Sequence, residues 1–278
     1  MAVFTNRATL SYSGITTASN TVTGSLVGAL SAQKTALADS YRTGGSITYV
    51  ISLINSGDAA ITGLTLTDDL GAGGAANAPL TYREGSCALF VNGVPASLPT
   101  VEAAARLELT GLDLPAHSNA LIIYTADVNE YAPLAAGSSI TNTAAAQPAG
   151  SAVTASATVP AADAPALAIE KQICPATVME NGTLTYTFII TNTGAAEAGA
   201  DEELFVEDAF SPVLSGLNVQ LDGKALLSPS DYTYDAQTGE FSTVPGAITV
   251  PAATFAQLAD GAYAVTPGRV TLTVSGTV

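Results

Sequence analysis

The stretch SITYVISLINSGDA, residues 46–59, alternates apolar and polar side chains and is rich in β-branched residues. A period of two residues is typical of a strand that buries one face. The stretch LTYTFIITN, residues 184–192, has the same character, and no long segment shows a clear helical period. The sequence therefore predicts an all-β protein.

The chain contains an internal repeat in which the first of these strands matches the second at an offset of 137 residues. Further landmarks match in the same order, with a three-residue insertion in the second copy. These landmarks are Lys34 with Lys171, LTLTDDL (64–70) with LFVEDAF (204–210), and NALIIYTADV (119–128) with RVTLTVSGTV (269–278). The agreement predicts two domains of one fold.

The two copies end differently. The first continues past Val128 through ITNTAAAQPAGSAVTASATVP (140–160), whereas the second stops at Val278. The missing piece has a counterpart at the start of the chain, because TN at 5–6 matches 141–142 and TASNTVT (17–23) matches TASATVP (154–160). We therefore expect residues 1–24 to be the final hairpin of a preceding domain that this chain lacks.

This organisation predicts two tandem immunoglobulin-like β-sandwiches, the second lacking its final strands, plus an N-terminal donor hairpin. The expected segments are donor strands and linker (1–31), first domain (32–160), linker (161–166) and second, incomplete domain (167–278). A sandwich without its last strands exposes unpaired backbone and an apolar groove. A hairpin donated by another copy would fill that groove, and head-to-tail donation produces an open filament.

Polar residues with reactive side chains recur at equivalent inward positions of the two copies. Alternation places Lys34 on the face of Leu30, Ala32 and Ala36, and it places Lys171 on the face of Leu167 and Ile169. The same argument turns Asp68 and Asp208 inward with their leucine neighbours, and it turns Asn142 and Asn6 inward with Ile140 and Phe4. An inward lysine is costly unless it is paired or neutralised.

An inward Lys, Asp and Asn on three strands is the arrangement needed for an isopeptide bond. Burial leaves the amine neutral and nucleophilic, and it keeps the aspartic acid protonated so that it polarises the Asn amide and shuttles protons. We expect Asp68 to assist an intramolecular Lys34–Asn142 bond, and Asp208 an intermolecular Lys171–Asn6 bond. Asn6 and Asn142 precede their next lysine by 28 and 29 residues, so both linkers should have similar geometry. The alternative is a buried Lys–Asp ion pair with a satisfied Asn nearby.

At these residues the chain resembles the bacterial conserved-repeat domain, a family of unknown function. The shared pattern is a Lys strand, then G-x-x-x-x-Y, N-x-G, an Asp strand and a late TN-x-A. The resemblance implies immunoglobulin-like sandwiches of bacterial surface proteins and stalks. It covers the first copy fully and the second up to Val278, where Lys171 and Asp208 match but no Asn follows.

Composition limits the other functions. The net charge of −16 argues against binding to nucleic acid or to an anionic membrane surface. No signal peptide, membrane span, cofactor motif or metal motif is visible, and no set of residues indicates an enzyme that turns over a substrate. We expect Cys87 and Cys174 to be buried free thiols rather than to form an interchain disulfide. We expect His117 to be a turn residue, and the acidic segment 197–208 to be a solvated insertion rather than a calcium loop.

The sequence thus favours a structural subunit of an extracellular or surface filament whose partners are copies of itself. The alternative is an adhesive or ligand-binding module of a larger bacterial surface protein. An exposed aromatic patch would favour that alternative, but aromatic residues make up only 6% of the chain.

Overall fold

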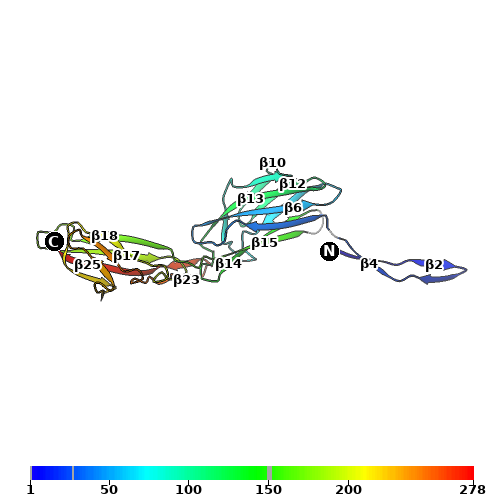
Figure 1. The fold of residues 1–278 in the computed structure, drawn as a ribbon. Helices are drawn as coiled ribbons and strands as arrows, with labels where there is room; N and C mark the ends of the chain where they lie inside the picture. The colour runs from blue at the N-terminus through cyan, green and yellow to red at the C-terminus, as the bar shows by residue number, and fades with distance from the viewer. Residues whose placement is uncertain (1, 27, 149–151) are drawn as a thin grey trace.

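The structure, a computed structural model, describes residues 2–26, 28–148 and 152–278. Within these ranges every named element is a β-strand and all strand pairs are antiparallel, so the all-β prediction is confirmed. None of the described segments is a helix long and apolar enough to span a membrane. Figure 1 shows two groups of sheets along one axis, with a hairpin beyond one group and the C-terminus at the far end of the other.

The first group, termed the first sandwich, consists of strands β5 to β15 in two facing sheets. One sheet has the order β10-β9-β13-β6-β5, with β8 also paired to β13; its strands are β5 (Leu30–Ala36), β6 (Ser46–Asn55), β8 (Leu80–Tyr82), β9 (Ala88–Val91), β10 (Val94–Ala96) and β13 (Ser118–Val128). The other has the order β11-β12-β7-β14-β15; its strands are β7 (Ile61–Asp68), β11 (Thr100–Ala103), β12 (Leu107–Leu114), β14 (Ser139–Gln147) and β15 (Val153–Pro160).

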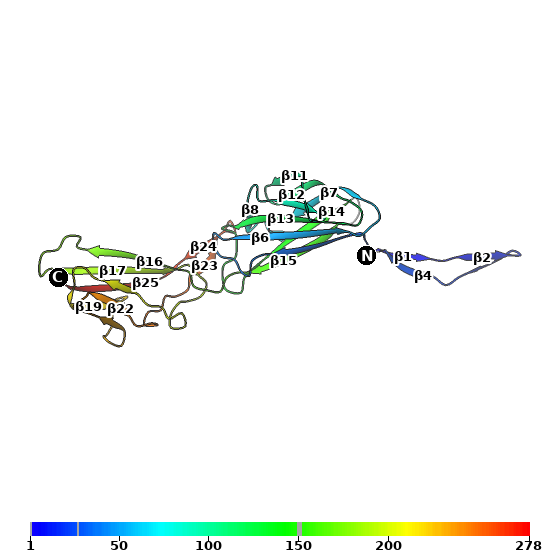
Figure 2. The same cartoon turned by 45° about the horizontal axis from the view of Figure 1, so that its top comes forward.

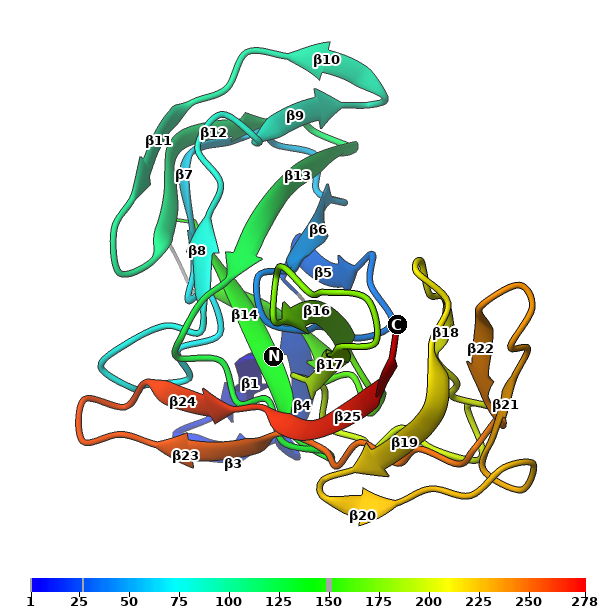
Figure 3. The ribbon, with the colours of Figure 1, turned by 90° about the vertical axis from the view of Figure 1, so that its left-hand side faces the viewer.

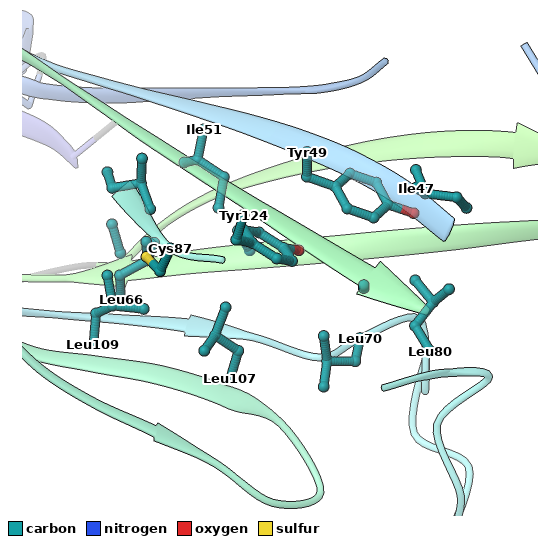
Figure 4. Packing of buried hydrophobic residues seen from close by; sticks show 14 of the residues in the cluster. Ile47, Tyr49, Ile51, Leu66, Leu70, Leu80, Cys87, Leu107, Leu109 and Tyr124 are labelled. Atoms are coloured by element: carbon teal, nitrogen blue, oxygen red, sulfur yellow. The ribbon is translucent and has the colours of Figure 1, made fainter. Parts of the chain in front are cut away.

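Alternation along β6 explains how the first sandwich forms. Ile47, Tyr49, Ile51 and Leu53 are fully buried, while the residues between them lie on the outer face. They meet leucines of β7 and β12 in one continuous core (Figure 4). Burying a side chain of this size contributes about 1.5–3 kcal/mol, so a one-residue slip of β6 would lose most of its stabilisation.

The second group, termed the second sandwich, has a core of its own that includes Phe210, Phe241 and Leu272. Its larger sheet has the order β16-β17-β25-β19-β20 and its smaller sheet the order β18-β22-β21. The strands are β16 (Leu167–Cys174), β17 (Thr183–Asn192), β18 (Glu207–Ala209), β19 (Ser215–Leu221), β20 (Lys224–Ala225), β21 (Tyr232–Tyr234), β22 (Glu240–Thr243) and β25 (Gly268–Thr277).

The two sandwiches differ at one strand edge. In the first, β7 lies between β12 and β14, with Asp68 opposite Leu107 on one side and Ala144 on the other. In the second, Asp208 of β18 lies opposite Phe241 of β22, but no described strand pairs with the other side of β18. Likewise β15 packs beside β5, whereas every residue of β16 is exposed. The second sandwich therefore lacks the neighbours that β14 and β15 provide in the first.

The opening segment forms an extended hairpin that projects from the first sandwich (Figure 1). Its strands are β1 (Ala2–Asn6), β2 (Thr9–Tyr12), β3 (Ile15–Ala18) and β4 (Val22–Leu26), with β1 paired to β4 and β2 to β3. The tight turn between β2 and β3 is Ser13–Gly14, and both residues have the positive φ that two-residue hairpin turns require. Side chains 4–23 are all exposed, including those of Phe4, Leu10 and Tyr12.

The pairing within this hairpin differs from that of its proposed counterpart. Asn142 lies opposite Ala157 in the β14–β15 pair, and the sequence match would place Asn6 opposite Asn20. The structure instead pairs Asn6 with Val22. The pairing of β1 with β4 is thus displaced by two residues from that match, which leaves each side chain of β1 on the same face.

A second hairpin extends from the second sandwich and packs against the first. It consists of β23 (Thr254–Gln257) and β24 (Tyr263–Thr266), and Figure 3 shows it extending away from β19 and β20. Phe255 and Val265 pack against the core of the first sandwich, and Tyr263 N donates a hydrogen bond of 2.7 Å to Glu130 O. The first sandwich has only a short turn at the equivalent place, between β12 and β13. The junction between the sandwiches is therefore braced by an insertion of the second.

Two buried leucines test whether the cores are separate cooperative units. Leu109 and Leu272 are each fully buried, one in each core. Leu109→Ala should destabilise only the first sandwich and Leu272→Ala only the second, each by about 2–5 kcal/mol. Differential scanning calorimetry should show one of two transitions moving in each variant. A single transition that moves equally in both variants would contradict separate cores.

Candidate crosslinking site

The centre of the first sandwich contains a buried lysine and a buried aspartate. Lys34 comes from the middle of β5 and Asp68 from the end of β7, so the facing sheets each supply one partner. Lys34 Nζ donates a hydrogen bond of 2.6 Å to Asp68 Oδ2. The exposed fractions of the two side chains are 0% and 1%. The predicted inward positions of both residues agree with this burial.

Tyr124 connects this pair to Asn142. The Tyr124 hydroxyl donates a hydrogen bond of 2.6 Å to Asp68 Oδ2 and accepts one of 2.9 Å from Asn142 Nδ2. Asn142 is fully buried, and its Oδ1 atom has no hydrogen-bond partner among the described residues. The structure therefore brings Lys34, Asp68 and Asn142 into one network, in which the amide oxygen of Asn142 is left unsatisfied.

Aromatic rings shield the network from water. Tyr49 and Tyr124 are stacked with ring centroids 5.5 Å apart, and Lys34 Nζ lies 4.7 Å from the centroid of the Tyr49 ring. Figure 4 shows both rings in the core, where they project from the neighbouring strands β6 and β13. Burial lowers the pKa of Lys34 from its ordinary value, although Asp68 opposes the shift. Burial also raises the pKa of Tyr124 well above its usual range, so this phenol stays protonated.

This geometry has two chemical interpretations. A hydrogen-bonded Lys34–Asp68 pair alone would be the structural alternative, but that alternative expected a satisfied Asn, and Asn142 is only half satisfied. In the second interpretation, Lys34 transfers a proton to Asp68, and the resulting neutral amine attacks Cγ of Asn142. The proton then passes through Asp68 to the leaving amide nitrogen, and ammonia departs. The covalent bond stays a prediction.

The equivalent pair in the second sandwich is open to solvent. Lys171 contacts Asp208 Oδ2, and the exposed fractions of these side chains are 42% and 16%. Lys171 Nζ lies 4.5 Å from the centroid of the Tyr186 ring, which repeats the position of Tyr49. Apart from the lysine, Asp208 Oδ2 has no hydrogen-bond partner in the described part of the chain. Lys171 and Asp208 are thus in contact, but no described strand covers them.

The second site also lacks the bridging phenol. The strand match places Val274 at the position of Tyr124, and Phe210 occupies the space beside Tyr186, with ring centroids 4.8 Å apart. Phe210 provides the aromatic wall but has no hydroxyl to link an aspartate to an asparagine. Any Asn that enters this site has to approach Asp208 directly.

Asn6 is not close to Lys171 within one chain. It lies on β1 opposite Val22, and the hydrogen bonds of side chains 4–20 all stay within the hairpin. Figures 1 and 2 place this hairpin at the end of the molecule opposite the second sandwich. The structure of a single chain therefore does not bring together Lys171, Asp208 and Asn6, and their proposed reaction remains a prediction about two copies.

Sequence reasoning missed the role of Tyr124. It lies on the inward face of β13, in alternation with Ile122 and Ala126, and this pattern identifies it as a buried tyrosine. Because a buried phenol needs a hydrogen-bond partner, the pattern could have placed it beside the predicted Lys–Asp–Asn set. Because the second copy has Val274 at this position, the internal repeat gave no indication that Tyr124 belongs to the site.

The remaining sequence predictions have mixed outcomes. Cys87 is a buried free thiol whose pKa is raised by burial to about 11. The expectation that Cys174 is buried is wrong, because it ends the uncovered edge strand β16 and is exposed. His117 lies in the turn before β13 and pairs with Asp58 at 2.9 Å. The acidic segment 197–208 is mostly loop, and its residues Asp201, Glu202 and Glu203 are exposed.

Comparisons with known proteins give only distant likenesses. No protein-family profile matches the chain, and no curated protein sequence matches it. Solved structures with some similarity include BspA_C_WT, with a TM-score of 0.40 and 13% identity over 88% of this chain and 91% of that chain.

Two pilus proteins also show some structural similarity. BcpA, the major pilin subunit of Bacillus cereus, has a TM-score of 0.36 and 14% identity over 87% of this chain and 66% of that chain. The pilus backbone RrgB from Streptococcus pneumoniae has a TM-score of 0.36 and 12% identity over 86% of this chain and 55% of that chain. Since these TM-scores are low, a function for this chain has to rest on its own residues.

The mass of the folded protein tests the intramolecular bond. If Lys34 and Asn142 react, the protein lacks the mass of one ammonia, and Asp68→Ala should restore it because the proton shuttle is lost. Intact-mass spectrometry measures this difference directly. A folded monomer that carries its full, unmodified mass would rule out the bond.

Tyr124→Phe refines this test. It keeps the aromatic wall but removes the hydrogen bonds to Asp68 and Asn142. We expect the bond to form more slowly, by a factor of about 10. An unchanged rate would mean that Tyr124 serves only for packing.

Proposed function

We propose that this chain is the structural subunit of an extracellular or surface filament, in which the opening hairpin of one copy completes the second sandwich of another. The observation that carries the proposal is the free edge of β18 beside the exposed strand β16, in a chain that also has a hairpin whose apolar side chains are exposed. Unpaired strand edges and exposed apolar faces are unfavourable in water, and strand addition relieves both.

The first sandwich supplies the expected geometry of the contact. On β14, the buried residues Ile140, Asn142, Ala144 and Ala146 face the core, with Ala144 opposite Asp68. Transferred to the second sandwich, this register puts Ala8 opposite Asp208, Asn6 beside the Lys171–Asp208 pair, and Leu10 opposite Val206. A groove of about 160 Å³ beside Val206 is lined by Leu167, Ile169, Leu204 and Phe205, and it would receive Leu10.

The same register supports an intermolecular isopeptide bond. Lys171 would attack Cγ of the incoming Asn6, with Asp208 relaying the proton to the departing ammonia. Strand insertion would remove the solvent that now reaches Lys171 and enclose its amine as the amine of Lys34 is enclosed. The donation itself needs no covalent bond, so the two steps are separable.

The positions of the two elements favour an open polymer. The hairpin and strand β18 lie at opposite ends of the molecule (Figure 1). A contact between different surfaces at opposite ends is head-to-tail, and it extends indefinitely unless its rotation closes a ring. Folding of the hairpin onto its own second sandwich would require the chain to bend back over the braced junction.

Removal of residues 2–26 tests the donation. The truncated protein should remain folded, because the first sandwich has its own β14 and β15, but it should form no filaments. Electron microscopy detects the filaments, and calorimetry confirms the fold. Filaments that still form without the hairpin would refute strand donation.

Denaturing electrophoresis tests the covalent step. Wild-type filaments boiled in detergent and reductant should give a series of multimers, and Lys171→Ala, Asp208→Ala and Asn6→Ala should each reduce it to monomer.

A matched control, Lys224→Ala, should keep the full series, because Lys224 is exposed and lies outside the proposed site. Wild-type filaments that dissolve entirely to monomer would leave only non-covalent donation.

A further inference from the structure

Arg7 is the single charged residue in the first 26 residues of the chain. It directly follows Asn6 at the end of β1, and in the isolated hairpin its Nε donates a hydrogen bond of 3.2 Å to Ser19 O. Alternation turns Arg7 to the face opposite Asn6 and Ala8, which is the outer face in the register proposed above. A lone arginine in a polar and apolar segment points to a specific acidic partner.

The first sandwich identifies what would lie opposite Arg7. The counterpart of Arg7 is Thr143, which hydrogen-bonds to Asp69 through both its N–H and its C=O. One strand further, Arg106 precedes Leu107, the residue opposite Asp68. The row across the outer face of this sheet is therefore Thr143, Asp69 and Arg106.

The second sandwich has a different row at this position. Ala209 replaces Asp69, and Glu240 of β22 lies opposite Ala209. With the hairpin inserted, the row would read Arg7, Ala209 and Glu240. The small alanine leaves room for the arginine and the glutamate to meet across it. Glu207, two residues along β18 on the same face, would be a diagonal neighbour of Arg7.

These acidic residues lie on a free, concave surface. Glu207, Asp235 and Glu240, together with Ala209, line a hollow of about 680 Å³ beside the open edge of β18. All three carboxylates are exposed, and none forms an ion pair with a described residue. The hollow thus combines an unpaired strand edge with uncompensated negative charge at the place where Arg7 would arrive.

We propose that Arg7 of one copy forms an ion pair with Glu240 and Glu207 of the next copy, and that this contact fixes the register of the donated strand. The inference rests on the proposed strand donation. A slip of one residue would turn Arg7 into the apolar core, where an unpaired charge is costly. The contact therefore fixes the register of the donated strand.

Charge reversal in the full-length chain tests the contact. Arg7→Glu should slow filament growth about tenfold at low salt, because the new carboxylate would face the carboxylates of the acidic hollow. The double variant Glu207→Lys/Glu240→Lys should be slowed by a similar factor, because its two lysines would face Arg7. Combining all three changes in one chain should restore growth to near the wild-type rate. Light scattering measures the rates, and electron microscopy confirms that filaments form.

Salt and a matched control make the result specific. Arg7→Gln should lose most of the wild-type dependence of the rate on salt, whereas Arg42→Gln, an exposed arginine of the first sandwich, should keep it. If Arg7→Glu grows filaments at the wild-type rate and with the wild-type dependence on salt, the ion pair does not exist, although strand donation still holds. Failure of the wild type to polymerise under any condition would overturn the proposed function itself.

Discussion

The free edge of β18 is the constraint on which the proposed assembly and the proposed chemistry both depend. A strand that carries buried polar side chains beside an apolar core is stabilised by a partner on each side, because the partners pair its N–H and C=O groups and keep water from the core. The first sandwich meets this requirement with β14 and β15 from its own sequence. The second has the same aspartate and lysine in place but no described strand beside them. The opening hairpin has the complementary character, with alternating apolar residues and no core of its own.

The covering strands also control the chemistry of the lysine. In the first sandwich Lys34 is fully enclosed by aromatic rings and by the strand that carries Asn142, and burial lowers its pKa. In the second, water reaches Lys171 and only part of the aromatic enclosure is present. If strand donation occurs as proposed, the incoming strand both delivers the amide and removes the water, so that the amine becomes reactive only after correct docking. Reaction with the wrong partner is thereby avoided without any regulatory element.

Alternation in the sequence was sufficient to predict the inward positions of Lys34, Asp68 and Asn142, because one face of each strand is consistently apolar. The same reasoning placed Lys171 and Asp208 as their counterparts. It could not predict Tyr124, whose match in the second copy is Val274, nor the brace formed by β23 and β24, which exists in only one copy. The expected burial of Cys174 was wrong because sequence patterns show which face of a strand is apolar, but not whether a neighbouring strand covers it.

Amide hydrogen exchange, comparing assembled filaments with protein lacking residues 2–26, is the most direct test of strand completion. We predict strong additional protection in the filament at two segments: β18 with its preceding residues 204–206, and strand β16. Exchange in β7 and β5 of the first sandwich should be the same in both samples, since these strands are already covered. Equal exchange of β16 and β18 in filaments and in the truncated protein would show that the open edge stays open, and would contradict completion of the second sandwich by a donated strand.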